Sequence, residues 1–194
     1  MTMPAVITNY QKQETVSRLK KAYTIINQAL RMSEAYNGEF ENWEDGFSIG
    51  AENYLNKYWL PYFNVSKLCV KYSTCGYKNT FPYIFLNGEK STLTFSARDK
   101  RIPFLTNDGI IYSISIAGGD VLVKEDSIYI DINGSKGPNK YGKDLFLFTR
   151  VNKKGILPLG FDNEINDCRR GGKGNYCAKK IIEDGWQIKE DYPW

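Results

Sequence analysis

A chain of 194 residues is long enough for one folded domain, or for one domain with an extended appendage. Its hydrophobic fraction of 42% can fill a core, and a net charge of +4 is too small to indicate a general nucleic-acid-binding protein. The chain has no histidine, which removes Ser-His-Asp and Cys-His catalysis and most zinc chemistry. We therefore do not expect an enzyme.

The first predicted element is a long amphipathic helix that begins at Pro4 and stops at Asn37-Gly38. Proline suits the first turn of a helix, and glycine readily takes the left-handed conformation that closes one. Apolar side chains recur at spacings of mostly three and four, as on one stripe of a helix. They are Val6, Tyr10, Val16, Leu19, Tyr23, Ile26 and Leu30.

A helix of this length is a rod of about 50 Å, longer than a domain built from the rest of the chain. We therefore divide the chain into this helix (1–37) and a globular head (38–194), and we expect the helix to project. Leu19, Tyr23, Ile26 and Leu30 would then hold the helix on the head, while Val6 and Tyr10 would face neighbouring molecules. The alternative is a helix packed wholly on its own domain.

Residues 38–80 are irregular and aromatic, with a short helix predicted over 50–59 and loop elsewhere. The aromatic side chains would form either a small core under a long connection or a sugar-binding face. They are Trp43, Phe47, Tyr54, Tyr58, Trp59, Tyr62 and Phe63.

From residue 81 the pattern changes to short strands rich in β-branched and aromatic residues. The predicted strands are Tyr83–Leu86, Thr92–Ala97, Ile110–Ile116, Asp120–Lys124, Ser127–Ile132 and Leu145–Thr149. Alternation within them indicates an antiparallel sheet with one buried face, and Gly118-Gly119 suits a hairpin turn. A helical turn over Cys177–Asp184 and a last strand in 186–194 complete the prediction. The fold class is α+β, with the long N-terminal helix packed on the sheet.

The four cysteines, Cys69, Cys75, Cys168 and Cys177, allow three disulfide pairings, among which the sequence does not choose. The sequential pairing would close two short loops. Disulfides persist in oxidising compartments, so the cysteines favour the periplasm or the cell exterior. Reduced cysteines in a cytosolic protein and a four-thiolate zinc site are the alternatives.

The segment from Asp131 to Asp144 packs glycine, proline, Asn and Asp between two strands. Calcium takes six to eight oxygen ligands, often from alternate positions of such a loop. Asp131, Asn133, Asn139 and Asp144 are the candidate calcium ligands, although Lys136, Lys140 and Lys143 oppose a cation. The alternative is a tight loop whose Asn and Asp side chains bond their own backbone.

A second segment, residues 168–180, carries five basic side chains and three glycines. It would be either a phosphate-binding patch or a solvated surface loop.

The stretches Pro4–Lys12, Arg18–Tyr23 and Gln28–Glu34, together with the Asp131–Asp144 loop and the Cys168–Trp194 tail, resemble the prepilin-type family. This family comprises type IV pilins and the pseudopilins of type II secretion systems. The resemblance implies that Pro4 matches the proline at which a membrane-spanning half-helix, absent from this chain, meets the amphipathic half. It also implies calcium in a C-terminal loop, as in some major pseudopilins.

The resemblance implies a structural subunit that assembles with copies of itself and other pilins or pseudopilins through the N-terminal helix. Its partners would be an inner-membrane assembly platform, a prepilin peptidase acting on the full-length precursor, and the membrane that holds the missing segment. The location would be the cell envelope, either anchored in the inner membrane or in an extracellular fibre. The alternative function is a minor-pilin or adhesin-like module that binds glycan or DNA.

Overall fold

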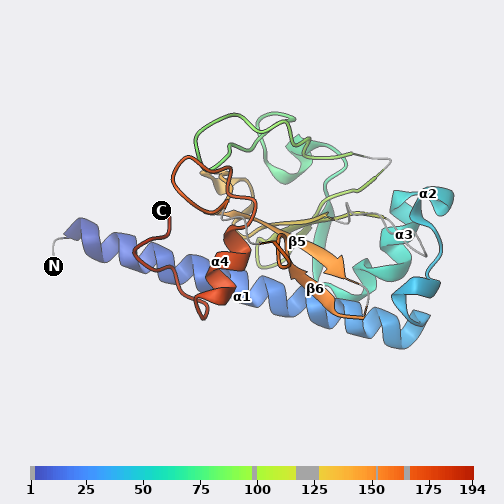
Figure 1. Cartoon of the computed structure of the whole chain (residues 1–194). Coiled ribbons are helices and arrows are strands. Elements are labelled where there is room, and N and C mark those ends of the chain that lie inside the picture. Colours follow the sequence, from blue (N-terminus) through green and yellow to red (C-terminus); the bar gives the residue numbers. More distant parts are fainter. Residues whose placement is uncertain (1–2, 98–99, 117–126, 152, 164–166) are drawn as a thin grey trace.

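The protein is described by a computed structural model, which covers residues 3–97, 100–116, 127–151, 153–163 and 167–194. Figure 1 shows one long helix, α1, lying along an antiparallel sheet, with shorter helices and irregular segments around it. The α+β prediction is therefore confirmed.

Helix α1 spans Met3–Asn37 and contains neither glycine nor proline after Pro4. It ends at Gly38, whose φ of 81° is the left-handed conformation predicted from the sequence. Inside the last turn, Asn37 Nδ2 donates to the carbonyl oxygen of Ser33 over 3.2 Å. No helix within the described ranges has a stretch long and apolar enough to cross a membrane.

Two short helices follow, α2 (Gly46–Ile49) and α3 (Ala51–Tyr58), flanked by the 3₁₀ turns η1 (Phe40–Asn42) and η2 (Leu60–Tyr62). Helix α3 confirms the short helix predicted over 50–59. Trp43 stacks on Tyr58 with ring centroids 4.4 Å apart, and both rings are buried. The aromatic side chains of this region therefore form a core beneath the connection, and Phe47 stays exposed.

The sheet has six strands: β1 (Val65–Leu68), β2 (Phe104–Thr106), β3 (Ile111–Ile114), β4 (Ser127–Asp131), β5 (Leu145–Val151) and β6 (Gly155–Pro158). Each strand pairs antiparallel with the next in the chain, so the spatial order is β1-β2-β3-β4-β5-β6. This meander leaves β1 and β6 as the two edges of the sheet.

Helix α1 covers one face of the sheet with its central and C-terminal turns. Leu19, Ala22, Ile26 and Leu30 are buried there. Opposite them lie the inward side chains of the strands, which are Phe104, Tyr112, Ile114, Ile128, Ile130, Phe146 and Phe148. The alternation of Ile110, Tyr112, Ile114 and Ile116 in the sequence marks this face.

The opposite face of the sheet is also covered, so the prediction of a single buried face is wrong. A second core forms between Ile111, Leu145 and Leu147 of the sheet and the irregular segment of residues 69–95, which supplies Tyr77, Tyr83 and Phe95. Burial on both faces explains why Ser113, which alternates with isoleucines, is itself only 7% exposed.

Several strand predictions fail because of this irregular cover. Tyr83–Leu86 and Thr92–Ala97 are not strands; Ile84 makes only isolated bridges, to Lys90 and Lys140. Strands β1, β2 and β6 lie in segments where no strand was expected, β1 within the region predicted as loop. The predicted strand Asp120–Lys124 and the Gly118-Gly119 turn lie outside the described residues.

The C-terminal part begins with helix α4 (Cys177–Glu183), which confirms the predicted helical turn. The predicted last strand in 186–194 does not form; the tail packs through Tyr192, which is 3% exposed. Disulfides join Cys69 to Cys75, across the 3₁₀ turn η3 (Tyr72–Cys75), and Cys168 to Cys177. Of the three possible pairings, the structure has the sequential one.

Candidate functional site

The loop between β4 and β5 is closed at its base by two buried carboxylates. Asp131 is the last residue of β4, and Asp144 directly precedes β5. Both side chains are 1% exposed, and Asp131 is the partner of Leu145 in the sheet register. The amide of Ile132 donates to the carbonyl oxygen of Asp144 over 2.9 Å. The antiparallel pairing therefore holds the two acids close to one another.

Asp131 belongs to a buried hydrogen-bonded chain with two tyrosines from the irregular cover. Tyr77 Oη donates to Asp131 Oδ2 over 2.5 Å, and Tyr77 Oη and Tyr83 Oη lie 3.0 Å apart. Burial, together with the nearby charge of Asp144, raises the pKa of Asp131 to about 8. A negative charge on this carboxylate is thus disfavoured unless a positive group compensates it.

Asp144 is bonded by the backbone of its own loop. The amide of Asn139 donates to Asp144 Oδ2 over 2.6 Å, and the amide of Lys140 donates to the other carboxylate oxygen. Asn139 has a φ of 53°, which turns its amide towards the acid. Burial still outweighs these bonds and raises the pKa of Asp144.

The two predicted amide ligands each keep one unused acceptor. Asn133 Nδ2 donates to the carbonyl oxygen of Gly137 over 3.0 Å. The side-chain oxygens Oδ1 of Asn133 and Asn139, in contrast, are buried and have no hydrogen-bond partner. A buried acceptor without a donor costs roughly 1–3 kcal/mol, so such an atom calls for an explanation, of which a bound water or ion is one.

The Asp and Asn side chains thus bond the backbone of their own loop, as in the alternative given above, and the amide of Asn133 also donates to Asp131 Oδ1 over 3.2 Å. A cation held by Asp131, Asn133, Asn139 and Asp144 stays a prediction. The cation would supply charge to the two carboxylates and coordination to the two amide oxygens. The described residues contain no cluster of three or more His, Cys, Asp or Glu side chains suited to a metal. A cation bound here would need the amide and backbone oxygens as further ligands, which suits calcium better than zinc.

The second disulfide loop is organised by an acid that the sequence analysis missed. Asp167 accepts hydrogen bonds from the amides of Lys173 and Asn175, over 2.9 and 2.7 Å, and from Asn175 Nδ2. The sequence feature that could have identified Asp167 is its place directly before a cysteine in a glycine-rich loop. Asp side chains in such loops often accept hydrogen bonds from the nearby backbone.

The basic side chains of residues 168–180 do not form one patch. Lys180 lies between Asp184 and Asp191, with Nζ–O distances of 3.3 and 2.6 Å. Lys179 contacts Glu183 and the carbonyl oxygen of Asn163. Arg169 and Arg170 are exposed on the loop itself. Two of the five basic side chains are thus paired with acids of the same molecule.

The two groups of predicted assembly residues on α1 lie in different environments. Leu19 and Ile26 are fully buried and Leu30 is nearly so, while Tyr23 stacks on Phe148 of β5 with centroids 5.3 Å apart. Val6 and Tyr10 are 52% and 66% exposed, and Ile7, between them, is 54% exposed. From Val6 to Glu14 no side chain is buried. The apolar stripe therefore continues beyond the surface that the head covers.

Comparison with known families identifies a family for this chain but no function. Residues 5–194 match the sequence model of a family of unknown function, DUF6613. No curated protein and no solved structure matches the chain.

Proposed function

The chain belongs to the DUF6613 family, whose function is unknown, and we propose that it is a structural subunit of a fibre that assembles through the N-terminal part of α1. The fibre is a type IV pilus or a type II secretion pseudopilus in the cell envelope. The neighbours in this proposal are copies of the chain and related pilin-like subunits. An inner-membrane platform and a prepilin peptidase act on the longer precursor.

The observation that carries the proposal is the division of α1 into a docked part and an exposed apolar part. Val6, Ile7 and Tyr10 present large apolar side chains to solvent in consecutive turns of one helix. Exposing them costs free energy that contact with another apolar surface would recover, at about 25 cal/mol per Å². A helix that leaves its own domain in this way supports helix-mediated assembly.

The docked part of α1 is held firmly, which a fibre subunit needs in order to transmit force. Arg18 Nη1 donates to the carbonyl oxygen of Ile132 over 2.6 Å, and Lys21 Nζ lies 2.8 Å from Asp108 Oδ2. Tyr112 Oη also donates to the carbonyl oxygen of Ala22 over 3.3 Å. These bonds join the helix to the β4–β5 loop, to the connection between β2 and β3, and to β3 itself.

The alternative, a glycan-binding or DNA-binding module, has less support. Trp43, Tyr54, Tyr58 and Trp59 lie in the core and cannot stack on a sugar ring. Lys179 and Lys180 are engaged with acids of the same molecule. The aromatic side chains are therefore not available to a sugar, and the basic segment offers fewer free cations to a phosphate than its sequence suggested.

The proposal is tested by placing a charge on the exposed apolar turn in the full-length precursor. Tyr10→Glu should abolish fibres seen by electron microscopy of sheared cells, because a carboxylate cannot be buried between helices without a partner. Met32→Glu is the matched control, since Met32 is 53% exposed on the docked half of the same helix. Normal fibres from Tyr10→Glu at normal subunit abundance would overturn the proposal.

A second candidate role, calcium binding by the β4–β5 loop, is favoured by the unpartnered oxygens of Asn133 and Asn139. In that role the ion fixes the loop that receives Arg18, and so fixes the rod to the head. Its test is the calcium titration given in the Discussion.

A further inference from the structure

A groove at the end of the molecule where α1 begins carries an excess of positive charge. It has a volume of about 770 Å³ and lies between the N-terminal half of α1, the β4–β5 loop and the C-terminal tail. Lys12, Lys140, Lys143 and Arg170 line this basic groove. None of these four has an ion-pair partner among the residues that the structure describes.

The acids of the groove do not neutralise it. Asp191 is already paired with Lys180, which leaves Glu190 as the remaining side-chain acid. Lys143 lies over the Trp194 ring, with its Nζ 5.0 Å from the ring centroid. An anionic group entering the groove would meet four cationic side chains, which attract it.

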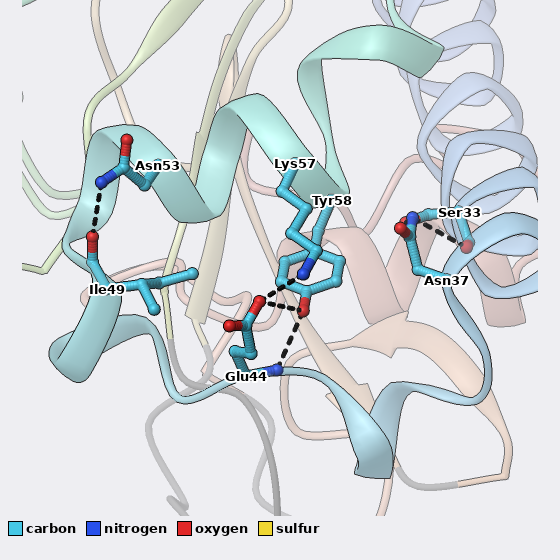
Figure 2. A network of polar contacts seen from close by, with 7 residues as sticks. All are labelled: Ser33, Asn37, Glu44, Ile49, Asn53, Lys57 and Tyr58. Atoms are coloured by element: carbon cyan, nitrogen blue, oxygen red, sulfur yellow. Dashed lines mark hydrogen bonds and ion pairs between the residues drawn. The ribbon is translucent and has the colours of Figure 1, made fainter.

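The opposite end of the molecule is acidic. Residues 32–56 contain six Asp or Glu side chains and neither Lys nor Arg. Figure 2 shows that Glu44 is engaged with Lys57 and Tyr58 of α3. We define the acidic end face as Glu39, Asp45 and Glu52, which lie beside η1, α2 and α3.

The remaining two acids of this end lie towards basic neighbours. Glu34 and Glu41 line a cavity of about 250 Å³ together with Arg31, Arg150 and Lys154. They are therefore left out of the acidic end face. The acids of this end that remain without a basic neighbour among the described residues are therefore those of the acidic end face, around α2 and α3.

The basic groove and the acidic end face are separated by the length of α1. From Lys12 to Asn37 the helix advances 25 residues, or about 38 Å at ~1.5 Å per residue. Figure 1 shows the C-terminal tail beside the N-terminal half of α1, and α2 and α3 at the other end of the molecule. The two charged surfaces thus cannot meet within one molecule.

We propose that the basic groove receives the acidic end face of a second copy of this chain, so that successive copies contact head to tail along the direction of α1. This inference rests on the proposed function, because it names the surfaces that join axial neighbours in the same fibre. A contact between two different faces of identical subunits produces a filament when its rotation does not close into a ring, and a contact along the direction of α1 is of this open kind. Opposite charges also set the polarity of the contact and disfavour head-to-head pairing.

A polyanion such as DNA fits the groove less well than this acidic face does. Glu190 and Asp191 lie among the cations and would repel a continuous row of phosphates. The acidic end face instead offers a few separate carboxylates.

The test is zero-length coupling of carboxylates to amines by a carbodiimide, in an equal mixture of ¹⁵N-labelled and unlabelled chains. An amide link from Lys12 to Glu39 must join two molecules, because Lys12 lies about 38 Å along α1 from Asn37. For links from Lys140 or Lys143 to Glu39 or Glu52, mixed-isotope pairs identify the ones that join two molecules. We expect such links at millimolar protein and about 0.02 M salt, and their loss at about 1 M salt, where charges are screened beyond roughly 3 Å.

Charge reversal gives the decisive comparison. Lys140→Glu with Arg170→Glu makes both ends acidic, and Glu39→Lys with Glu52→Lys makes both ends basic. Yield is counted only for groups that the variant leaves unchanged: links from Lys12 and Lys143 in the first variant, and links to Asp45 in the second. Each double variant alone should lose at least tenfold in these links, and an equal mixture of the two should recover them. Lys71→Glu with Glu89→Lys is the matched control at exposed sites outside both surfaces, and it should change nothing.

Absence of groove-to-acidic-end links in the native chain would overturn the inference, as would full yield from either reversed variant alone. Tyr10→Glu separates this outcome from the fate of the proposed function. Fibres lost in Tyr10→Glu but intact in both reversed variants would leave helix-mediated assembly standing without the head-to-tail contact. The opposite pattern would leave the contact standing without the helix.

Discussion

Tyr23 of α1 donates its hydroxyl hydrogen to the carbonyl oxygen of Ile156 over 2.8 Å, and Ile156 lies on the edge strand β6. The amide of Ile156 donates to Oδ1 of Asn27 over 3.4 Å, and Asn27 lies one turn after Tyr23 on α1. Two side chains of the helix thus occupy both backbone groups of one edge residue. An unpaired edge is a template for further strands, so this arrangement protects the sheet on its β6 side.

Removing the Tyr23 hydroxyl should destabilise the protein measurably. Tyr23→Phe keeps the stack on Phe148 but leaves the Ile156 carbonyl without its donor. We expect a loss of about 1 kcal/mol in the free energy of unfolding, measured by urea denaturation. Tyr10→Phe is the control, because Tyr10 is exposed and should tolerate the change. Equal stabilities of the two variants would contradict the role given to this bond.

The ion pair between Lys21 and Asp108 should contribute stability in a pH-dependent way. Burial opposes ionisation of Asp108, but the Lys21 ammonium and the Thr106 hydroxyl outweigh it and hold the pKa of Asp108 below its usual value. The folded state therefore binds this proton less tightly than the unfolded state does. The contribution is present above about pH 4 and is lost as the pH falls through the folded pKa.

Lys21→Met should accordingly cost about 0.5 kcal/mol at neutral pH, a small value because the Lys21 side chain is 57% exposed. The cost should shrink as the pH is lowered below 4, and urea titrations at the two pH values measure it. Lys67→Met, at an exposed position of β1, serves as the control. A cost that stays the same in acid would show that the pair itself contributes nothing.

Calcium should stabilise the protein through the β4–β5 loop. At a free concentration one hundred times the dissociation constant, the expected gain is about 2.7 kcal/mol, or roughly 2–4 °C in Tm for each kcal/mol. Asn139→Gly removes an amide oxygen while tolerating the φ of 53°, and it should lose most of this shift. Lys153→Gly, at a positive φ elsewhere in the chain, should keep it. Identical melting of the native chain with calcium and with chelator would exclude the site.

Gly142 should be irreplaceable where the β4–β5 loop meets the second disulfide. Its φ is 73°, and an added Cβ would lie 2.7 Å from Cys177 Sγ and 3.2 Å from Tyr192 Oη. Tyr192 Oη also donates to the Gly142 carbonyl oxygen over 2.5 Å. Gly142→Ala should therefore destabilise the protein by more than the ~1–2 kcal/mol of the left-handed conformation alone. Gly171→Ala, with a φ of 80° and open space around it, measures that conformational cost separately.

The sequence predicted the parts of the fold whose local pattern agrees with their tertiary setting. The stripe from Leu19 to Leu30 repeats at helical spacing and is buried, and Gly38 ends the helix where expected. Alternation in β3 and β4 likewise identified the side chains that face α1. In these elements one period fixes both the secondary structure and the buried face.

The failures come from contacts that no local pattern records. Tyr83 and Phe95 have the composition of strand residues, yet they cover the far face of the sheet from irregular backbone. Strand β6 is short and ends at Pro158, and its position depends on pairing with β5 and on the bond from Tyr23. Long-range packing overrides β propensity in such segments.

The candidate cation site was predictable in composition but not in detail. The four residues Asp131, Asn133, Asn139 and Asp144 follow from the loop sequence. That two of their oxygens lack donors depends on the course of the backbone. The basic groove was not foreseen, because Lys12 and Arg170 are 158 positions apart in the sequence and meet only in the folded chain.

The covering of both sheet faces restricts how copies of this molecule can associate. One face is closed by α1 and the other by residues 69–95, so in the part of the chain that the structure describes neither face of the sheet is left bare for a second sheet to stack on. A dimer in which the sheets of two copies stack face to face is therefore disfavoured. Contacts between copies are directed to the perimeter of the molecule: the exposed turns at the start of the rod, the tips of its long axis, and the open side of β1.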